Sequence, residues 1–331
     1  MKRVAVIADS LEWVQAQRVK DLQPYLPDFT LVVMTPEMIG GPTGGIGSFY
    51  TMSFVGYDYA AVWLSSWRIL LAHPWLSYWL RPNHTLASVT SHYNLGGGLK
   101  PDTCFRKGAD PKEEFQRAIE TLRYFKVVTC NSKILHDMLQ PHLPNVILAQ
   151  NGVDAEFFRS SERILFGDGR LAFTTIGKQK EAKNAIALAT AATELEARHD
   201  WFRWNAFLKK KWLNSKFTRH EVRSLLLLSD FYVCASWSEG TPNGLLEAAA
   251  CGLPVITTMV GNAPELIREG ETGWFIEPTA ESLIACIERL QYLQPWEYRR
   301  MSEQIREDIE AGWTWEKRAP AFRRALEAAC A

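Results

Sequence analysis

The stretch that decides the fold is Ser236–Pro254, which reads SWSEGTPNGLLEAAACGLP. An apolar run precedes it and glycine and proline interrupt that run, which predicts a strand over Asp230–Ala235, a loop, and a helix over Asn243–Cys251. The first N–H groups of such a helix have no intrahelical partner and lie at the positive end of the helix dipole. The stretch therefore predicts a turn that favours an anion such as a diphosphate.

Two carboxylates flank this turn, because Glu239 lies in the loop and Glu247 lies one turn into the helix. Both could contact one ligand from the same side, and neither position has the sequence surroundings of a buried structural site. The E-x7-E spacing by itself favours an ordinary strand–loop–helix unit that carries two surface glutamates. The residues around the pair therefore have to decide between the two interpretations.

The surrounding residues make the pattern specific. After the helix LLEAAACG come the strand PVITT and two further segments, Gly261–Ile267 (GNAPELI) and Gly270–Trp274 (GETGW). This block resembles the donor-site signature of the retaining GT-B glycosyltransferases of family 4, also called glycosyltransferase group 1. The resemblance implies two Rossmann-like domains that face each other across a cleft. It also implies transfer of a sugar from a nucleoside-diphosphate sugar to an acceptor hydroxyl, with retention of the anomeric configuration.

Strand and helix patterns alternate along the chain, which predicts an α/β fold with parallel sheets and helices on both faces. A second alternating series covers Ala172–Ile276, and the tail from Pro295 to Ala331 has a helical pattern throughout. In the first half, helical patterns at Trp13–Leu22 and Pro111–Phe125 separate strands expected over Arg3–Ala8, Thr30–Met34, Tyr59–Leu64, Leu86–Thr90, Val127–Cys130 and Val146–Ala149.

The polar, glycine-containing stretch Ser160–Arg170 is the predicted linker. We therefore expect an N-terminal acceptor-side domain over residues 1–160 and a nucleotide-sugar domain over residues 168–311. A C-terminal helix of about residues 312–331 is expected to pack back onto the first domain. The segment Asn151–Asp154, followed by Phe157, resembles the family's turn before the linker, and we expect it to set the hinge.

Two lysines follow the predicted strand LAFTTI, since Gly177-Lys178 ends it and Lys183-Asn184 opens the next helix. Members of the family carry Gly-Arg and Lys-Gly at these places, where the two cations clamp the diphosphate. The resemblance thus assigns both lysines to phosphate, although lysine at position 178 lacks the bidentate fork of arginine. The alternative is a solvated helix start with exposed lysines.

A histidine follows the strand that ends near Thr90, in the order Ser91-His92-Tyr93-Asn94 and then Gly96-Gly97-Gly98. Ligands of open α/β sheets bind beyond the carboxyl ends of the strands. The resemblance implies that His92 lies beside the donor sugar and the departing phosphate, and glycine would let the backbone approach a ligand closely. A purely structural histidine is the alternative.

The expected site is assembled from these segments. Glu239 is expected to bind sugar hydroxyls, Glu247 the ribose, and the backbone N–H groups around residues 241–245 the diphosphate. No metal or other cofactor is expected to be required, because lysines and a helix terminus can hold the diphosphate and no Asp-x-Asp motif occurs. The expected catalytic residues are His92, Glu239, Lys178 and Lys183, and the expected donor-binding residues are Gly177, Gly240, Thr241, Pro242, Asn243, Gly244, Leu245 and Glu247.

The chain has 37 basic and 37 acidic residues, so its formal net charge is zero. This balance excludes a protein that attracts nucleic acid through a positive net charge. The expected partners are a nucleotide sugar and an unknown glycan, lipid-linked or other acceptor. The apolar segment Trp63–Leu80 is interrupted by a charge and a proline, so it indicates at most peripheral membrane contact. Six scattered cysteines and the lack of a secretory pattern favour a reducing, cytoplasmic location.

Other interpretations stay open at this point. A sugar-nucleotide epimerase or a phosphorylase would share the fold but would need its own acid/base residues or a cofactor-binding lysine. A catalytically silent protein would bind a nucleotide sugar without transferring or hydrolysing it. The glycine-rich stretch Gly40–Gly47 is expected either to cover the acceptor or to be a flexible connector. The stretch Trp201–Trp212 favours an edge strand followed by a solvated loop over a base-stacking or lipid surface.

Overall fold

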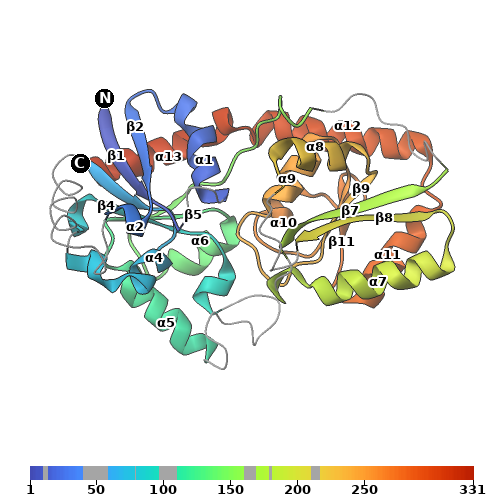
Figure 1. Cartoon of the computed structure of the whole chain (residues 1–331), viewed down its shortest axis with the longest axis horizontal. Helices are drawn as coiled ribbons and strands as arrows, with labels where there is room; N and C mark the ends of the chain where they lie inside the picture. Colours follow the sequence, from blue (N-terminus) through green and yellow to red (C-terminus); the bar gives the residue numbers. More distant parts are fainter. Residues whose placement is uncertain are drawn as a thin grey trace. The chain divides into compact units, whose positions relative to one another are not determined.

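The chain folds into two compact units that have separate cores (Figure 1). The computed structural model describes residues 1–9, 14–39, 59–78, 80–96, 110–159, 169–178, 181–209 and 217–331. Unit 1 contains the described residues of 1–96, 110–151 and 315–331, and unit 2 those of 152–314. The stretch Gly40–Gly47 and most of the predicted linker lie outside the described residues.

Unit 1 is built on a parallel sheet of strand order β2-β1-β3-β4-β5-β6. Its strands are β1 (Lys2–Ile7), β2 (Phe29–Met34), β3 (Ala61–Leu64), β4 (Thr85–Val89), β5 (Val127–Cys130) and β6 (Val146–Leu148). Its helices are α1 (Val14–Leu22), α2 (Pro36–Ile39), α4 (Arg68–Ala72), α5 (Pro111–Leu122), α6 (Lys133–Leu139) and α13 (Trp315–Cys330), with short 3-10 turns at Gln23–Tyr25, Pro74–Tyr78, Pro82–His84 and His92–Leu95.

Alternate residues of these strands build two cores, one on each face of the sheet. Ala5 and Ile7 of β1 face the layer that contains α4, α5 and α6, whereas Val4 and Val6 face α1 and α13. Trp63 of β3 packs on Phe322 of α13 with ring centroids 5.9 Å apart. Burial on both faces explains why the strands read as continuous apolar runs.

Unit 2 repeats the pattern with a parallel sheet of order β11-β10-β9-β7-β8. Its strands are β7 (Leu171–Lys178), β8 (Phe202–Lys209), β9 (Phe231–Cys234), β10 (Val255–Thr257) and β11 (Gly273–Phe275). Its helices are α7 (Ala185–Arg198), α8 (Arg219–Leu227), α9 (Asn243–Ala250), α10 (Ala263–Leu266), α11 (Ala280–Leu290) and α12 (Pro295–Gly312), with a 3-10 turn at Glu181–Lys183.

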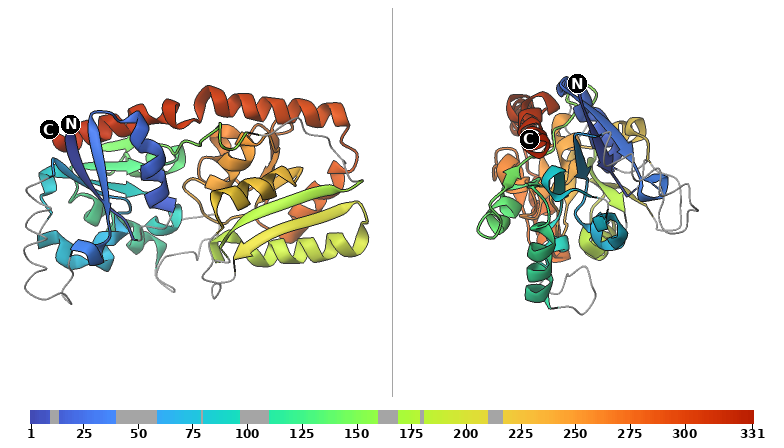
Figure 2. Two further views of the ribbon diagram at one scale, coloured as in Figure 1. Left: turned by 45° about the horizontal axis from the view of Figure 1, so that its top comes forward. Right: turned by 90° about the vertical axis from the view of Figure 1, so that its left-hand side faces the viewer.

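The sheet of unit 2 is also covered on both faces, and Figures 1 and 2 show α7 and α11 on the side opposite α9 and α12. Phe173 and Phe231 belong to the α7–α11 core, where their rings stack 5.1 Å apart. Tyr232 and Val255 belong to the core beneath α9 and α12. The edge strand predicted from Trp201 onward is β8, at one end of the sheet.

The boundary between the units lies before the predicted linker. Within the described residues, the chain passes from unit 1 to unit 2 between Asn151 and Gly152 and returns between Thr314 and Trp315. Phe158 is 1% exposed in the core of unit 2, so the segment after Asn151 already belongs to that unit. The Val153 backbone N–H donates to the carbonyl of Trp313 at 2.9 Å, which joins the two crossing segments.

The C-terminal tail is helical, as its sequence pattern indicates, with a break near residue 312, where the C-terminal helix was expected to begin. The helix α12 ends at Gly312 and α13 begins at Trp315, so the tail forms two helices. Glycine is common where helices end. The first helix packs on unit 2 through Ile305 and Ile309, and the second packs on unit 1. Among the helices described, none is both long and apolar enough to cross a bilayer.

Candidate active site

The turns after β7 and β9 meet because these two strands are neighbours in the sheet of unit 2. One turn carries Lys183, and the other carries Glu239. A backbone hydrogen bond ties them, since the Trp237 N–H donates to the carbonyl of Ala182 at 2.8 Å. A small pocket beside this junction is lined by Thr175, Ile176, Gly177, Lys183, Tyr232, Cys234, Ala235 and Ser236. The junction lies beyond the carboxyl ends of the strands, where such sheets bind ligands.

The structure brings two of the predicted catalytic residues into direct contact. The Lys183 Nζ donates to Glu239 Oε1, and their side chains are 30% and 12% exposed. Burial lowers the pKa of the ammonium, but the charge of Glu239, with Cys234 and the hydrogen bond, outweighs that effect and raises it above its ordinary value. Lys183 is therefore a cation throughout the neutral range.

Glu239 is buried, whereas its sequence surroundings had predicted an exposed position. The residue is 9% exposed, because Ser236 and Lys183 enclose its carboxylate from two sides. The Ser236 hydroxyl donates to the same Oε1 at 2.9 Å. Sequence reasoning did not identify Ser236; its place just after a buried strand was the available signal.

Gly177 and Lys178 end β7 beside this pair. A Cβ atom on Gly177 would lie 3.8 Å from the Lys183 Cε atom, so the glycine backbone lines the path of the lysine side chain. The backbone of Lys178 pairs with that of Lys209. The side chain of Lys178 lies outside what the structure describes, and its predicted role stays a prediction.

Asn184 stands where the family resemblance predicts a glycine, directly after Lys183. Its backbone is left-handed, with φ 53° and ψ 44°, a conformation that glycine and asparagine tolerate best. Its side-chain amide donates to the carbonyl of Pro278 at 2.8 Å. Asparagine therefore holds the turn that presents Lys183 and also ties it to the segment before α11.

We expect Asn184→Ala to lower the free energy of unfolding more than Asn184→Gly does. Alanine loses the hydrogen bond, worth about 1 kcal/mol, and adds a left-handed backbone cost of about 1–2 kcal/mol. Glycine loses the hydrogen bond but accepts the backbone angles. Urea unfolding of the two variants measures the difference, and equal midpoints would contradict the backbone argument.

The helix α9 begins as predicted, and it exposes fewer N–H groups than expected. Pro242, at its N-cap, has no N–H, and the Leu245 N–H donates to the carbonyl of Pro242 at 2.8 Å. The Leu245 side chain is fully buried in the core. The Leu245 N–H is thus engaged within the first turn of the helix, which Asn243 and Gly244 begin, and the predicted role of Leu245 in binding the nucleotide sugar stays a prediction.

Tyr232 lies directly beneath this turn, and sequence reasoning did not identify it. A Cβ atom on Gly244 would lie 2.4 Å from the Tyr232 hydroxyl oxygen, so any larger residue at this position would have to displace the tyrosine or the first turn of the helix. Burial raises the pKa of Tyr232 well above its ordinary value, and Cys234, Glu247 and Glu239 add to the shift. The phenol is therefore neutral and supports the start of α9.

Gly244→Ala is expected to destabilise the protein by about 1–3 kcal/mol through this overlap. Adding Tyr232→Phe should recover much of that loss, because it removes the oxygen that the new methyl group meets. Gly312→Ala is the control: it meets no atom within 4 Å and should be neutral or slightly stabilising. Thermal unfolding measures all three, and a double variant no more stable than Gly244→Ala would contradict the proposed contact.

The loop after β10 packs against the glutamate loop. Gly261 has φ 56°, and a Cβ there would lie 2.4 Å from the Gly240 carbonyl oxygen. Only glycine combines this left-handed angle with so close an approach. Two of the predicted motif glycines, Gly240 and Gly261, therefore lie against each other and fix the backbone that leads to α9.

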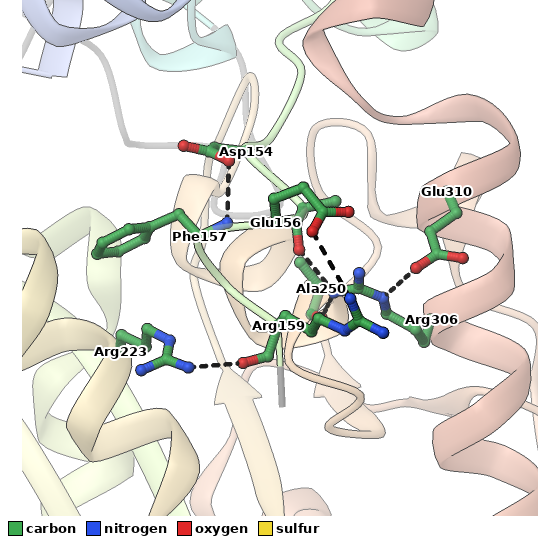
Figure 3. Close-up of polar contacts among 9 residues, drawn as sticks. Asp154, Glu156, Phe157, Arg159, Arg223, Ala250, Arg306 and Glu310 are labelled. Atoms are coloured by element: carbon green, nitrogen blue, oxygen red, sulfur yellow. Dashed lines mark hydrogen bonds and ion pairs between the residues drawn. The ribbon is translucent and has the colours of Figure 1, made fainter. Parts of the chain in front are cut away.

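The far end of α9 is anchored by Arg306 of α12, as Figure 3 shows. Its guanidinium donates to the carbonyl of Ala250, the last residue of α9, and to that of Ala155 at 2.8 Å. A cation at a helix C-terminus is favoured by the dipole. In the same segment, Asp154 accepts from the Phe157 N–H at 3.0 Å. Arg306 thus ties the residue that follows the Asn-Gly-Val-Asp motif to the end of α9.

His92 belongs to unit 1, whereas the other predicted site residues belong to unit 2. It begins a 3-10 turn after β4 and is 6% exposed. Gly96 has φ 77°, and a Cβ there would lie 2.4 Å from the Pro111 carbonyl oxygen. Gly96 therefore lets the start of α5 pack closely against this turn. Gly97 and Gly98 lie outside the described residues.

Comparisons with known proteins relate part of the chain to one family. Residues 170–291 match the family described as Glycosyl transferases group 1. The chain is 37% identical over 97 residues to N-acetyl-alpha-D-glucosaminyl L-malate synthase of Bacillus anthracis, a match that covers 29% of this chain and 25% of that protein. The sequence relationship therefore concerns about a quarter of the relative.

Solved structures resemble the chain over nearly its whole length. Sucrose-phosphate synthase of Thermosynechococcus elongatus is similar with a TM-score of 0.78 and 15% identity, over 99% of this chain and 98% of the other. HepE of Anabaena, in complex with UDP-glucose, is similar with a TM-score of 0.72 and 13% identity, over 99% and 100%. The predicted GT-B fold with two Rossmann-like domains is confirmed, and the predicted glycosyltransferase group 1 family is confirmed for the matched residues.

Proposed function

We propose that this protein, whose residues 170–291 belong to the glycosyl transferases group 1 family, transfers a sugar from a nucleoside-diphosphate sugar to an acceptor hydroxyl. The observation that carries the proposal is the contact of Lys183 with Glu239 at the carboxyl ends of β7 and β9, beside the start of α9. A cation, a fixed carboxylate and a helix N-terminus within one junction match a ligand that has both a diphosphate and a sugar.

The diphosphate is the leaving group, and its developing charge is the main obstacle to the reaction. Lys183 would bind its oxygens, together with Lys178 and the N–H groups at the first turn of α9. Preorganised donors of this kind stabilise charge without reorganisation during the reaction. In this proposal the protein groups balance the diphosphate, and no resident metal is needed.

Glu239 would act on the sugar. Its Oε1 accepts from both Ser236 and Lys183, and the contacts of the described residues leave Oε2 for sugar hydroxyls and for positive charge at the anomeric carbon. Glu247 would bind the ribose. The resemblance assigns His92 to the sugar and the departing phosphate, and this role belongs to the proposal as well. Retention and assignment to family 4 follow the resemblance of the motifs and belong to this proposal.

The test is a thermal-shift screen with UDP-, GDP-, ADP- and dTDP-sugars, followed by NMR of the products. A true donor at a hundred times its dissociation constant adds about 2.7 kcal/mol to the stability. UDP-glucose is the first to test, since HepE was solved with it. Epimerised sugar from donor alone would favour the epimerase, and a sugar phosphate that forms only when inorganic phosphate is added would favour the phosphorylase. Binding with neither transfer nor slow hydrolysis would favour a silent binding protein.

A further inference from the structure

Ser236 holds the Glu239 carboxylate in one position. The serine is 2% exposed and donates to Glu239 Oε1 at 2.9 Å. Its own hydroxyl oxygen accepts from the Cys234 thiol at 3.5 Å, and its carbonyl accepts from the Thr258 hydroxyl at 2.6 Å. The serine is thus fixed from both sides, and Glu239 cannot turn away without breaking a buried hydrogen bond.

The fixed carboxylate of Glu239 is already paired with the ammonium group of Lys183, which a diphosphate would need for binding. Within the described part of the chain, Glu239 is the ion-pair partner of the Lys183 ammonium. A diphosphate that reaches Lys183 therefore meets a negative charge that stays within contact distance of the same nitrogen. Like charges this close disfavour each other, and the effect is stronger where water is excluded.

We propose that Ser236 is a positioning residue that keeps Glu239 against Lys183, so that the site selects the sugar-bearing diphosphate over the free nucleoside diphosphate. The inference rests on the proposed function. With a sugar present, the carboxylate accepts hydrogen bonds from its hydroxyls, which offsets the repulsion. Once the sugar has left, the diphosphate lies beside an uncompensated carboxylate and is released.

The test is calorimetric titration of inorganic pyrophosphate and of UDP into the unchanged protein and four variants. Glu239→Gln keeps the shape and removes the charge, so we expect both probes to bind about tenfold more tightly, the equivalent of 1.4 kcal/mol. Ser236→Ala releases the carboxylate and should tighten binding about threefold. Glu281→Gln removes an exposed glutamate at the start of α11 and should change nothing.

Ser236→Thr separates positioning from a merely structural effect. It keeps the hydroxyl and should restore the affinity of the unchanged protein for both probes. A serine that only supported the fold would, when replaced by alanine, lower the stability and leave the affinity unchanged or weaker.

The outcomes separate this inference from the proposed function. If neither the unchanged protein nor any variant binds either probe, the proposed diphosphate site itself is contradicted. Binding by the unchanged protein, with Glu239→Gln and Ser236→Ala equal to it or weaker, would overturn the selection by Ser236 and Glu239 while leaving the site intact. Binding only by Glu239→Gln would support the inference.

Discussion

Replacing Lys183 with methionine is expected to slow sugar transfer by about 10²–10³-fold, the loss typical of one preorganised donor to a developing negative charge. The ammonium lies at the junction of the two turns and is charged throughout the neutral range, as the raised pKa indicates. Methionine keeps the length of the side chain but contributes no charge. Steady-state rates with the donor found in the screen measure the effect.

Three further variants interpret that result. Lys20→Met makes the same change at an exposed position of α1 and should leave the rate unaltered. Lys183→Arg keeps the charge and should retain part of the activity. Lys183→Met leaves Glu239 buried without its cation, so the double variant with Glu239→Gln separates lost stability from lost catalysis. A single variant that folds and transfers sugar at the normal rate would contradict the role of Lys183.

Glu239→Gln is expected to lower the turnover number by about 10²–10³-fold, because the amide cannot stabilise positive charge at the anomeric carbon. The same variant should hold free diphosphate more tightly, so its rate and its product affinity change in opposite senses. This combination distinguishes a fixed charge from a residue that only binds substrate, whose loss would raise KM and leave the turnover number unchanged.

The control for this variant is Glu281→Gln, which makes the same chemical change at an exposed position of unit 2. It should show normal turnover and normal product inhibition. Near-normal turnover in Glu239→Gln, measured on protein that unfolds at the usual temperature, would contradict the assignment of this glutamate to the reaction.

Much of the fold could be predicted because its strands are buried on both faces. Apolar runs such as Val127–Cys130 match the observed strand, and the helix after Pro242 begins where the glycine and proline signals place it. The C-terminal helix was expected to begin near residue 312, which is close to the observed break between α12 and α13, and Gly312 is the local signal for it. The unit boundary was missed because the segment after Asn151 packs on unit 2.

Part of the site could be predicted because its motifs are local. Lys183 and Glu239 were identified separately, from residues that follow two different strands. Their direct contact could not be predicted, since it depends on β7 and β9 being neighbours in the sheet. Ser236 and Tyr232 were missed for the same reason, because each acts on a residue that only the folded chain places beside it.

The most direct test of the central claim is a crystal structure of the protein with its nucleotide-sugar donor bound. The account predicts diphosphate oxygens within hydrogen-bond distance of Lys183 Nζ and of the first N–H groups of α9. It also predicts a sugar hydroxyl on Glu239. A diphosphate bound elsewhere, with Lys183 still paired only to Glu239, would contradict the account.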